Sequence, residues 1–203
     1  MQLKANNLGA RYGKGAWLFR GIDFSLEAGE IVGLLGPSGC GKTTFSRMLS
    51  GYDSPEEGYV TLNENPLPTQ SYSPVQLVFQ HPEKAVNPRW KMKKILNEGW
   101  EPDQQLLSML GIQEEWLTRW PNELSGGELQ RFCVARSLSP ETRFLIADEM
   151  TTMLDAITQA QIWNAVLDIA SERKMGILII SHEWNLMKRL CTKVVDFKKL
   201  ISV

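Results

Sequence analysis

Eight consecutive residues carry the groups needed to hold a chain of phosphates. Segment 36–43 has three glycines and ends in Lys42 and Thr43, the spacing of the G-x-x-x-x-G-K-[ST] phosphate loop. Glycine lets backbone N–H groups approach an anion closely, and the N-terminus of a following helix adds positive partial charge. Lys42 would bridge the β- and γ-phosphates, while the Thr43 hydroxyl would ligate Mg²⁺. The sequence therefore predicts a site for a nucleoside triphosphate and magnesium.

Two adjacent acids end an apolar run farther along the chain. Residues 144–147 are Phe, Leu, Ile and Ala, and Asp148 and Glu149 follow them. In this arrangement the first carboxylate can hold the magnesium shell, and the second can orient or deprotonate a water molecule. Taken alone, the pattern fits equally well a strand that runs out into solvent. Together with a phosphate loop, it favours hydrolysis of the triphosphate.

Buried strands and helices must bring these groups together. The run 31–35 is apolar throughout and directly precedes the phosphate loop, as expected of a strand covered on both faces. A helix is predicted to begin near Lys42. The runs 144–147 and 177–180 also indicate buried strands, and apolar spacing predicts a helix over 156–173 between them. These strand–helix units predict an α/β fold with a largely parallel sheet.

Two further parts are predicted around this core. Segments 2–8 and 21–26 indicate strands, and the alternation in the second is typical of a half-exposed antiparallel strand. Residues 80–139 combine helical patterns and prolines with four of the seven tryptophans, for which a lobe core is the favoured role. We therefore expect a P-loop NTPase core with an N-terminal antiparallel β region and an inserted helical subdomain. In this division a single domain spans 1–203, with the ATP-binding core in 1–79 and 140–203 and the subdomain in about 80–139.

The stretch from Leu124 to Arg131 indicates a narrower class. Its letters, L-S-G-G-E-L-Q-R, resemble the signature motif of the ATP-binding cassette (ABC) ATPases. Free N–H groups at a helix start, together with the Ser125 hydroxyl, can grip a phosphate. The resemblance implies that Ser125, Gly126 and Gly127 complete the site of the opposite subunit, so that two ATP molecules are sandwiched at a dimer interface.

Other motifs of that family occur in the same order along the chain, from Tyr12 to about Phe197. The resemblance implies that Tyr12 stacks on adenine, that Gln80 contacts magnesium and the attacking water, and that His182 contacts the γ-phosphate. Nucleotide contacts are thus implied for Tyr12, Gly36, Pro37, Ser38, Gly39, Cys40, Gly41, Lys42, Thr43, Thr44, Gln80, Ser125, Gly126, Gly127, Glu128 and Asp148. Metal contacts are implied for Thr43, Gln80 and Asp148, and catalytic roles for Lys42, Gln80, Glu149 and His182.

Two positions depart from the family pattern. Met150 stands where proline usually follows the second acid, and Met153 replaces a small alanine in the segment that crosses the dimer interface. Neither change removes a catalytic group. We therefore expect an active ATPase in which the bulkier Met153 alters how two subunits communicate.

Residues 78–82 read V-F-Q-x-P and residues 87–89 read N-P-R. This segment resembles the corresponding segment in the ATPase subunits of peptide and nickel importers. The resemblance implies transmembrane permease subunits and a second ABC ATPase subunit as partners, with a substrate-binding protein acting indirectly. A simple connecting turn is the alternative role of this segment. For the whole protein, the alternative is a soluble ABC ATPase in an assembly such as that of C–P bond metabolism.

Composition fits a peripheral protein on the cytoplasmic face of the cell membrane. Net charge is −1, which gives no support for nucleic-acid binding. The N-terminus has no apolar signal sequence, and the apolar runs fall short of the roughly 20 residues of a membrane span. Because the chain ends soon after the strand expected over 193–197, we expect a cassette without a regulatory extension. The three well-separated cysteines indicate reduced thiols, with Cys40 as an alkylation-sensitive one.

Overall fold

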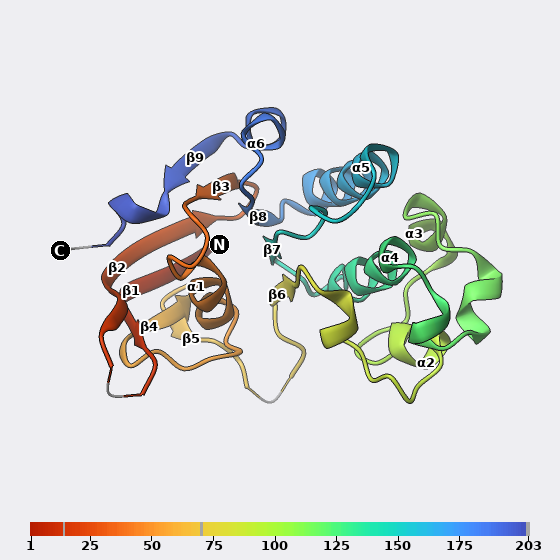
Figure 1. The fold of residues 1–203 in the computed structure, drawn as a ribbon, viewed down its shortest axis with the longest axis horizontal. Coiled ribbons are helices and arrows are strands. Elements are labelled where there is room, and N and C mark those ends of the chain that lie inside the picture. The colour runs from red at the N-terminus through yellow and green to blue at the C-terminus, as the bar shows by residue number, and fades with distance from the viewer. Residues whose placement is uncertain (14, 70, 202–203) are drawn as a thin grey trace.

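Two sheets organise the chain, whose computed structural model describes residues 1–13, 15–69 and 71–201 (Figure 1). Residues 14, 70, 202 and 203, which fall in the predicted core, lie outside the described residues. The first sheet is antiparallel, with strand order β2-β1-β4-β5. Its strands are β1 (Gln2–Arg11), β2 (Trp17–Glu27), β4 (Glu57–Leu62) and β5 (Asn65–Pro66).

The second sheet is parallel, with strand order β6-β7-β8-β3-β9. Its strands are β3 (Ile31–Leu35), β6 (Val75–Val78), β7 (Phe144–Asp148), β8 (Gly176–Ile180) and β9 (Lys193–Asp196). Every residue of β7 and β8 is buried, in agreement with their continuous apolar sequence. The predicted α/β fold with an N-terminal antiparallel region is confirmed.

Helices lie between and beside the strands. α1 (Lys42–Leu49) follows β3, α5 (Ala156–Arg173) joins β7 to β8 over the range expected from its spacing, and α6 (Trp184–Leu190) precedes β9. Three others, α2 (Met92–Leu96), α3 (Gln104–Met109) and α4 (Gly126–Ser137), occur between β6 and β7. Figure 1 shows these three on the side of the molecule away from β1, β2 and β4.

Each face of the parallel sheet has its own apolar core. On one face, α1 packs between the two sheets through Phe45, which is fully buried and lies edge-on to Phe19 and Phe24 with ring centroids 6.3 and 5.6 Å apart. Such edge-to-face contacts add to the gain from burial and fix α1 behind the phosphate loop. On the other face, α5 and the helices between β6 and β7 share a second core.

The tryptophans of segment 80–139 mostly serve packing. Trp90, Trp100 and Trp116 are partly buried against the second core, as predicted for most of them, whereas Trp120 is 40% exposed. Some strand boundaries differ from the predicted ones. Strands β1 and β2 extend beyond the predicted ranges because they pair along most of their lengths. Phe197, predicted to end the last strand, instead begins a short 3-10 turn.

Candidate functional site

The carboxyl ends of four parallel strands meet at one edge of the sheet, and a candidate residue follows or ends each. Strand β3 leads into the phosphate loop, β6 into Gln80, β7 ends in Asp148, and β8 leads through Ser181 into His182. The register aligns Leu34 of β3 and Asp148 of β7 with the same residue, Ile180. Ligands of open parallel sheets usually bind at this edge, so the topology gathers residues that are far apart in the sequence.

The phosphate loop turns tightly and holds Lys42 against itself. Gly41 has φ 105°, and a Cβ there would lie 2.8 Å from a ring carbon of Phe19, so glycine alone fits this position. Lys42 is only 7% exposed, and its Nζ donates to the carbonyl oxygens of Gly36 (2.7 Å) and Pro37 (2.9 Å). The ammonium group is therefore already at the mouth of the loop, bound to groups that an anion can replace.

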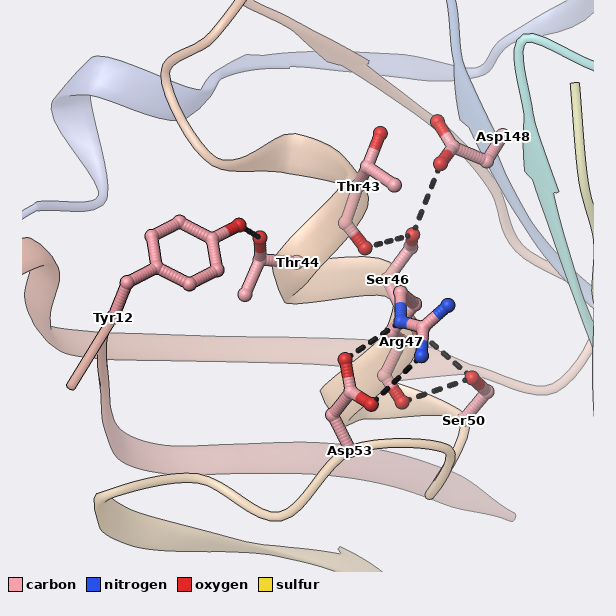
Figure 2. A network of polar contacts seen from close by, with 8 residues as sticks. All are labelled: Tyr12, Thr43, Thr44, Ser46, Arg47, Ser50, Asp53 and Asp148. Carbon is pink, nitrogen blue, oxygen red and sulfur yellow. Dashed lines mark hydrogen bonds and ion pairs between the residues drawn. The ribbon is translucent and has the colours of Figure 1, made fainter.

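Asp148 reaches the first turns of α1 (Figure 2). The Ser46 hydroxyl lies 3.3 Å from Asp148 Oδ2 and 2.9 Å from the Thr43 carbonyl oxygen. Asp148 is 4% exposed, and burial raises its pKa; the Glu149 charge acts in the same direction, while the Thr43 hydroxyl opposes it. Hydroxyl and carboxylate oxygens are the donors that Mg²⁺ prefers, so the groups present here fit that ion.

Glu149 lies at the centre of a three-residue cluster. Gln80 Nε2 donates to one oxygen of its carboxylate at 2.9 Å, and His182 Nδ1 lies 3.6 Å from the other. The Glu149 side chain is 19% exposed, so its carboxylate still reaches solvent, and that of His182 is 58% exposed. The φ of Glu149 is +50°, in the left-handed region that residues with a Cβ rarely occupy. Three segments thus converge on one carboxylate.

A cavity of about 550 Å³ joins most of these groups. At its rim, Tyr12 is 75% exposed and its hydroxyl lies 3.1 Å from Thr44 Oγ1 (Figure 2). The volume lies within the range of small-molecule sites. Its lining consists of Tyr12, Leu18, Ser38, Gly39, Gly41, Lys42, Thr43, Thr44, Gln80 and Glu149. The geometry therefore unites an exposed ring, a phosphate loop and a candidate base around one space.

The predicted signature residues occupy another place. Ser125 caps α4: its Oγ accepts from Glu128 N at 3.3 Å, and Glu128 Oε2 accepts from Ser125 N at 2.7 Å. This reciprocal capping box leaves the glycines between them at the helix start. Among the described residues that line the 550 Å³ cavity, none belongs to 125–128. The structure therefore separates the signature segment from the phosphate loop of the same chain.

Comparison with known proteins decides the class. A family model described as "ABC transporter" matches residues 19–152. This chain belongs to the ABC transporter family. It is 34% identical over 196 residues to the nickel import ATP-binding protein NikE of Escherichia coli strain K12, covering 86% of this chain and 72% of that protein. To the nickel import system ATP-binding protein NikE of Staphylococcus aureus strain N315 it is 34% identical over 200 residues, covering 92% and 82%.

Solved structures agree on the fold of this cassette. The ATP-binding cassette MJ0796, in a dimeric post-hydrolysis state bound to ADP and Pi, matches with a TM-score of 0.80 at 22% identity, covering 96% of this chain and 93% of that one. CbiO1 from Clostridium perfringens, described as part of the transporter complex cbiONQ, matches at 0.76 and 24% identity, covering 96% and 83%. With the family match, these place the chain among the ATPase domains of ABC transporters.

A second cleft lies beside the end of β6. It encloses about 390 Å³, and the Arg47 guanidinium at its wall is paired with Asp53 at 2.6 Å. The Arg136 guanidinium, also on the wall, pairs with Glu98. The other lining residues are Tyr52, Tyr72, Gln76, Leu77, Val78, Phe79, Lys84, Ala85, Gly99, Cys133 and Ser137. The cleft therefore runs between the parallel sheet and the helices that follow β6.

Two residues at this site were given no role of their own in the sequence analysis, although Gln130 belongs to the signature stretch. Ser46 occurs three residues after Thr43 on the same face of α1, a spacing from which its contact could have been anticipated. Gln130 is buried in α4 and bonds to segments about 20 and 50 residues away, which no local pattern indicates.

All three cysteines are free thiols, as predicted. No helix within the described ranges is both long and apolar enough to cross a membrane.

Proposed function

We propose that this cassette hydrolyses ATP to energise a membrane importer whose cargo is a peptide, nickel or a related metal chelate. The observation that carries the ATPase part is the single cavity shared by Tyr12, Lys42 and Glu149. The importer part is supported by relatives named for nickel import, which align over most of this chain. The V-F-Q-x-P segment that ends β6 supports the same assignment.

In the proposed nucleotide complex, Tyr12 stacks on adenine and the loop amides of 36–44 surround the phosphates. Lys42 exchanges the Gly36 and Pro37 carbonyls for β- and γ-phosphate oxygens, a short movement because the ammonium already lies at the loop. Thr43, Asp148 and Gln80 would hold Mg²⁺, and the bound ion would supply positive charge that stabilises the transferred phosphate. The exposed His182 ring is free to turn toward the γ-phosphate.

Glu149 is proposed to activate the attacking water. Its carboxylate borders the cavity and is held by Gln80 at 2.9 Å, so one oxygen is fixed while the group stays accessible. A carboxylate so placed can orient the water and take its proton, a contribution of roughly 10²–10⁴-fold for general bases. Positioning and charge stabilisation supply most of the remaining acceleration in phosphoryl transfer.

The sandwich dimer is proposed because the cavity is incomplete within one chain. The nucleotide would contact Ser125, Gly126, Gly127 and Glu128 of a second cassette, identical or related, since these residues do not line the cavity of their own chain. The helix start at Gly126 is open: apart from its chain neighbours and its own helix backbone, no heavy atom of the described residues lies within 4 Å of a Cβ placed there. Such an open helix N-terminus suits a phosphate supplied from outside the chain.

The output side is proposed to be the 390 Å³ cleft at the end of β6. In this scheme the core of 1–79 and 140–203 binds ATP, and the helical subdomain of about 80–139 moves against it. A cytoplasmic helix of a transmembrane permease docks in the cleft between them, which places the cassette on the cytoplasmic face of the cell membrane. A substrate-binding protein delivers the cargo to the permease from the other side.

The test is capture of the closed state. Tagged Glu149→Gln is trapped with MgATP, recovered from detergent-solubilised membranes of the native host and analysed by mass spectrometry. The matched control is Glu149→Gln combined with Lys42→Ala, which cannot close on ATP. A multi-span permease enriched over the control supports the importer. Enrichment of soluble enzymes alone would refute it and favour a soluble assembly such as that of C–P bond metabolism.

A further inference from the structure

A buried amide in α4 ties together the two segments that carry Gln80 and Glu149. Gln130 is 1% exposed, and its Nε2 donates to the carbonyl oxygens of Phe79 at 3.1 Å and of Met150 at 2.8 Å. Its two amide hydrogens are thus both used. One acceptor directly precedes Gln80 and the other directly follows Glu149, so one side chain fixes the backbone on both sides of the pair.

The pair held in this way is itself in contact. Gln80 Nε2 donates to Glu149 Oε2 at 2.9 Å, so Gln130, Gln80 and Glu149 form a closed circuit through two backbone segments and one side-chain bond. Because the circuit is closed, a shift of either carbonyl relative to α4 changes the separation of the two candidate catalytic side chains. Small displacements of this kind have large effects on positioned reactions.

Glu149 also needs such support for its backbone. Its φ of +50° is unfavourable for a residue with a Cβ and persists only where surrounding contacts hold it. Three bonds do so: Glu149 N donates to Ile180 O at 2.9 Å, Thr152 N to Glu149 O at 3.2 Å, and Gln130 to Met150 O. Of these, only the Gln130 bond comes from α4, the helix that begins at the signature segment.

The other amide atom of Gln130 argues against a purely structural role. Within the described residues, Gln130 Oε1 is buried with no hydrogen-bond partner, an arrangement that costs stability. An apolar side chain of the same length would avoid that cost, but it would also leave the carbonyls of Phe79 and Met150 without this donor. The value of the amide therefore lies in what its nitrogen donates to, namely the two catalytic segments.

We infer that Gln130 is a positioning residue for ATP hydrolysis, which sets the separation of Gln80 and Glu149 and couples it to the position of α4. This inference rests on the proposed ATPase mechanism. When a second subunit or a permease shifts α4, the two carbonyls follow the Gln130 amide, so the geometry around Glu149 responds to events at the signature segment.

The test compares Gln130→Met with Gln161→Met in the purified full-length chain. Gln161, on α5, is partly buried and accepts from Arg131 at 2.8 Å. Among the hydrogen bonds of the described residues it makes none to either catalytic segment, so Gln161→Met controls for the loss of a partly buried glutamine. We expect Gln130→Met to lower kcat by about 10- to 100-fold, the effect of a misplacement of about 1 Å. ATP affinity, measured with a fluorescent analogue, should stay within about twofold of wild type. General damage to the fold would lower affinity and kcat together, so a loss of kcat alone points to positioning.

Several results would overturn the inference. One is a kcat of Gln130→Met equal to that of wild type. Another is that Gln130→Met loses ATP affinity, kcat and thermal stability together, each by more than Gln161→Met does. That second result would make Gln130 a structural residue. If Gln130→Met does not fold, Gln130→Asn, which keeps the amide but is too short to reach both carbonyls, takes its place under the same criteria. Failure of both variants to fold would likewise assign Gln130 to stability.

A double-variant cycle adds a readout specific to positioning. If Gln130 acts through the Gln80–Glu149 pair, Gln130→Met should cost much less in a Gln80→Ala background, whereas independent sites give additive effects. Wild type and Glu149→Gln are measured in the same assay. Equal kcat values for wild type and Glu149→Gln would refute the proposed ATPase mechanism. If Glu149→Gln is slower than wild type but the effects of Gln130→Met and Gln80→Ala add, only the role of Gln130 is refuted.

Discussion

Replacement of Lys42 by methionine should uncouple the protein from ATP without unfolding it. The methionine side chain matches the apolar stem of lysine but lacks the ammonium group, which in the structure donates hydrogen bonds to the carbonyl oxygens of Gly36 and Pro37. In the proposed ATP complex the same two bonds go to phosphate oxygens. The substitution therefore removes two hydrogen bonds from the ATP-free protein and two from the ATP complex. The affinity for ATP changes only by the difference in strength between bonds to carbonyl oxygens and bonds to phosphate oxygens.

That difference can be estimated. Hydrogen bonds that involve a charged group contribute about 1.5–3 kcal/mol. With a neutral carbonyl acceptor at the lower end of that range and a charged phosphate oxygen at the upper end, each exchange gains about 1.5 kcal/mol. Two exchanges give about 3 kcal/mol, or about 100-fold in affinity at 1.4 kcal/mol per tenfold. At an ATP concentration of about 100 times the wild-type Kd, ligand binding stabilises wild type by about 2.7 kcal/mol and the variant by only about 0.4 kcal/mol.

Thermal unfolding with and without MgATP measures this directly. For a chain of this size, about 1 kcal/mol corresponds to about 2–4 °C in Tm, so the wild-type midpoint should rise by about 5–11 °C and that of Lys42→Met by about 1–2 °C. Lys4→Met, an exposed substitution on β1, is the control and should behave as wild type. An equal ATP-induced rise in Lys42→Met and wild type would refute the assignment of 36–43 as the phosphate-binding loop.

Three further predictions concern catalysis, thiol chemistry and assembly. Glu149→Gln should bind MgATP but lose about 10²–10⁴-fold in steady-state ATP turnover; unchanged turnover would remove Glu149 from its proposed role. Burial raises the pKa of Cys133 to about 12 and of Cys191 to about 11, so at about pH 8 their thiolate fractions are about 10⁻⁴ and 10⁻³. Iodoacetamide followed by peptide mass spectrometry should therefore label Cys40 first, and MgATP should protect it; equally fast labelling of Cys133 would contradict the buried environment. Met153 is 65% exposed, so in the Glu149→Gln background Met153→Ala should weaken the MgATP-dependent dimer by about 10-fold through lost apolar burial, and sedimentation showing equal or tighter association would contradict this.

Residue order alone was sufficient to predict strands β3 and β7 and to propose a phosphate loop at 36–43. The glycine, lysine and threonine spacing of 36–43 depends on local backbone geometry, and an apolar run before it is enough to predict β3. The acids after 144–147 end a similar apolar run, and the loop at 36–43 was needed to interpret them as more than a strand end. Each of these patterns lies within one strand and the turn that follows it, so it can be found without knowing how the chain packs.

Only the tertiary structure brings Gln80 to 2.9 Å from Glu149 and His182 to 3.6 Å from it. The sequence pointed to these residues through family resemblance, but their meeting depends on β6, β7 and β8 ending at one edge of the sheet. The sequence also did not predict the left-handed backbone of Glu149 or the hydrogen bonds of Gln130. A side chain such as that of Gln130 bonds to backbone carbonyls, and because every residue has a carbonyl, no residue type marks the partner. Contacts of this kind are decided by packing alone.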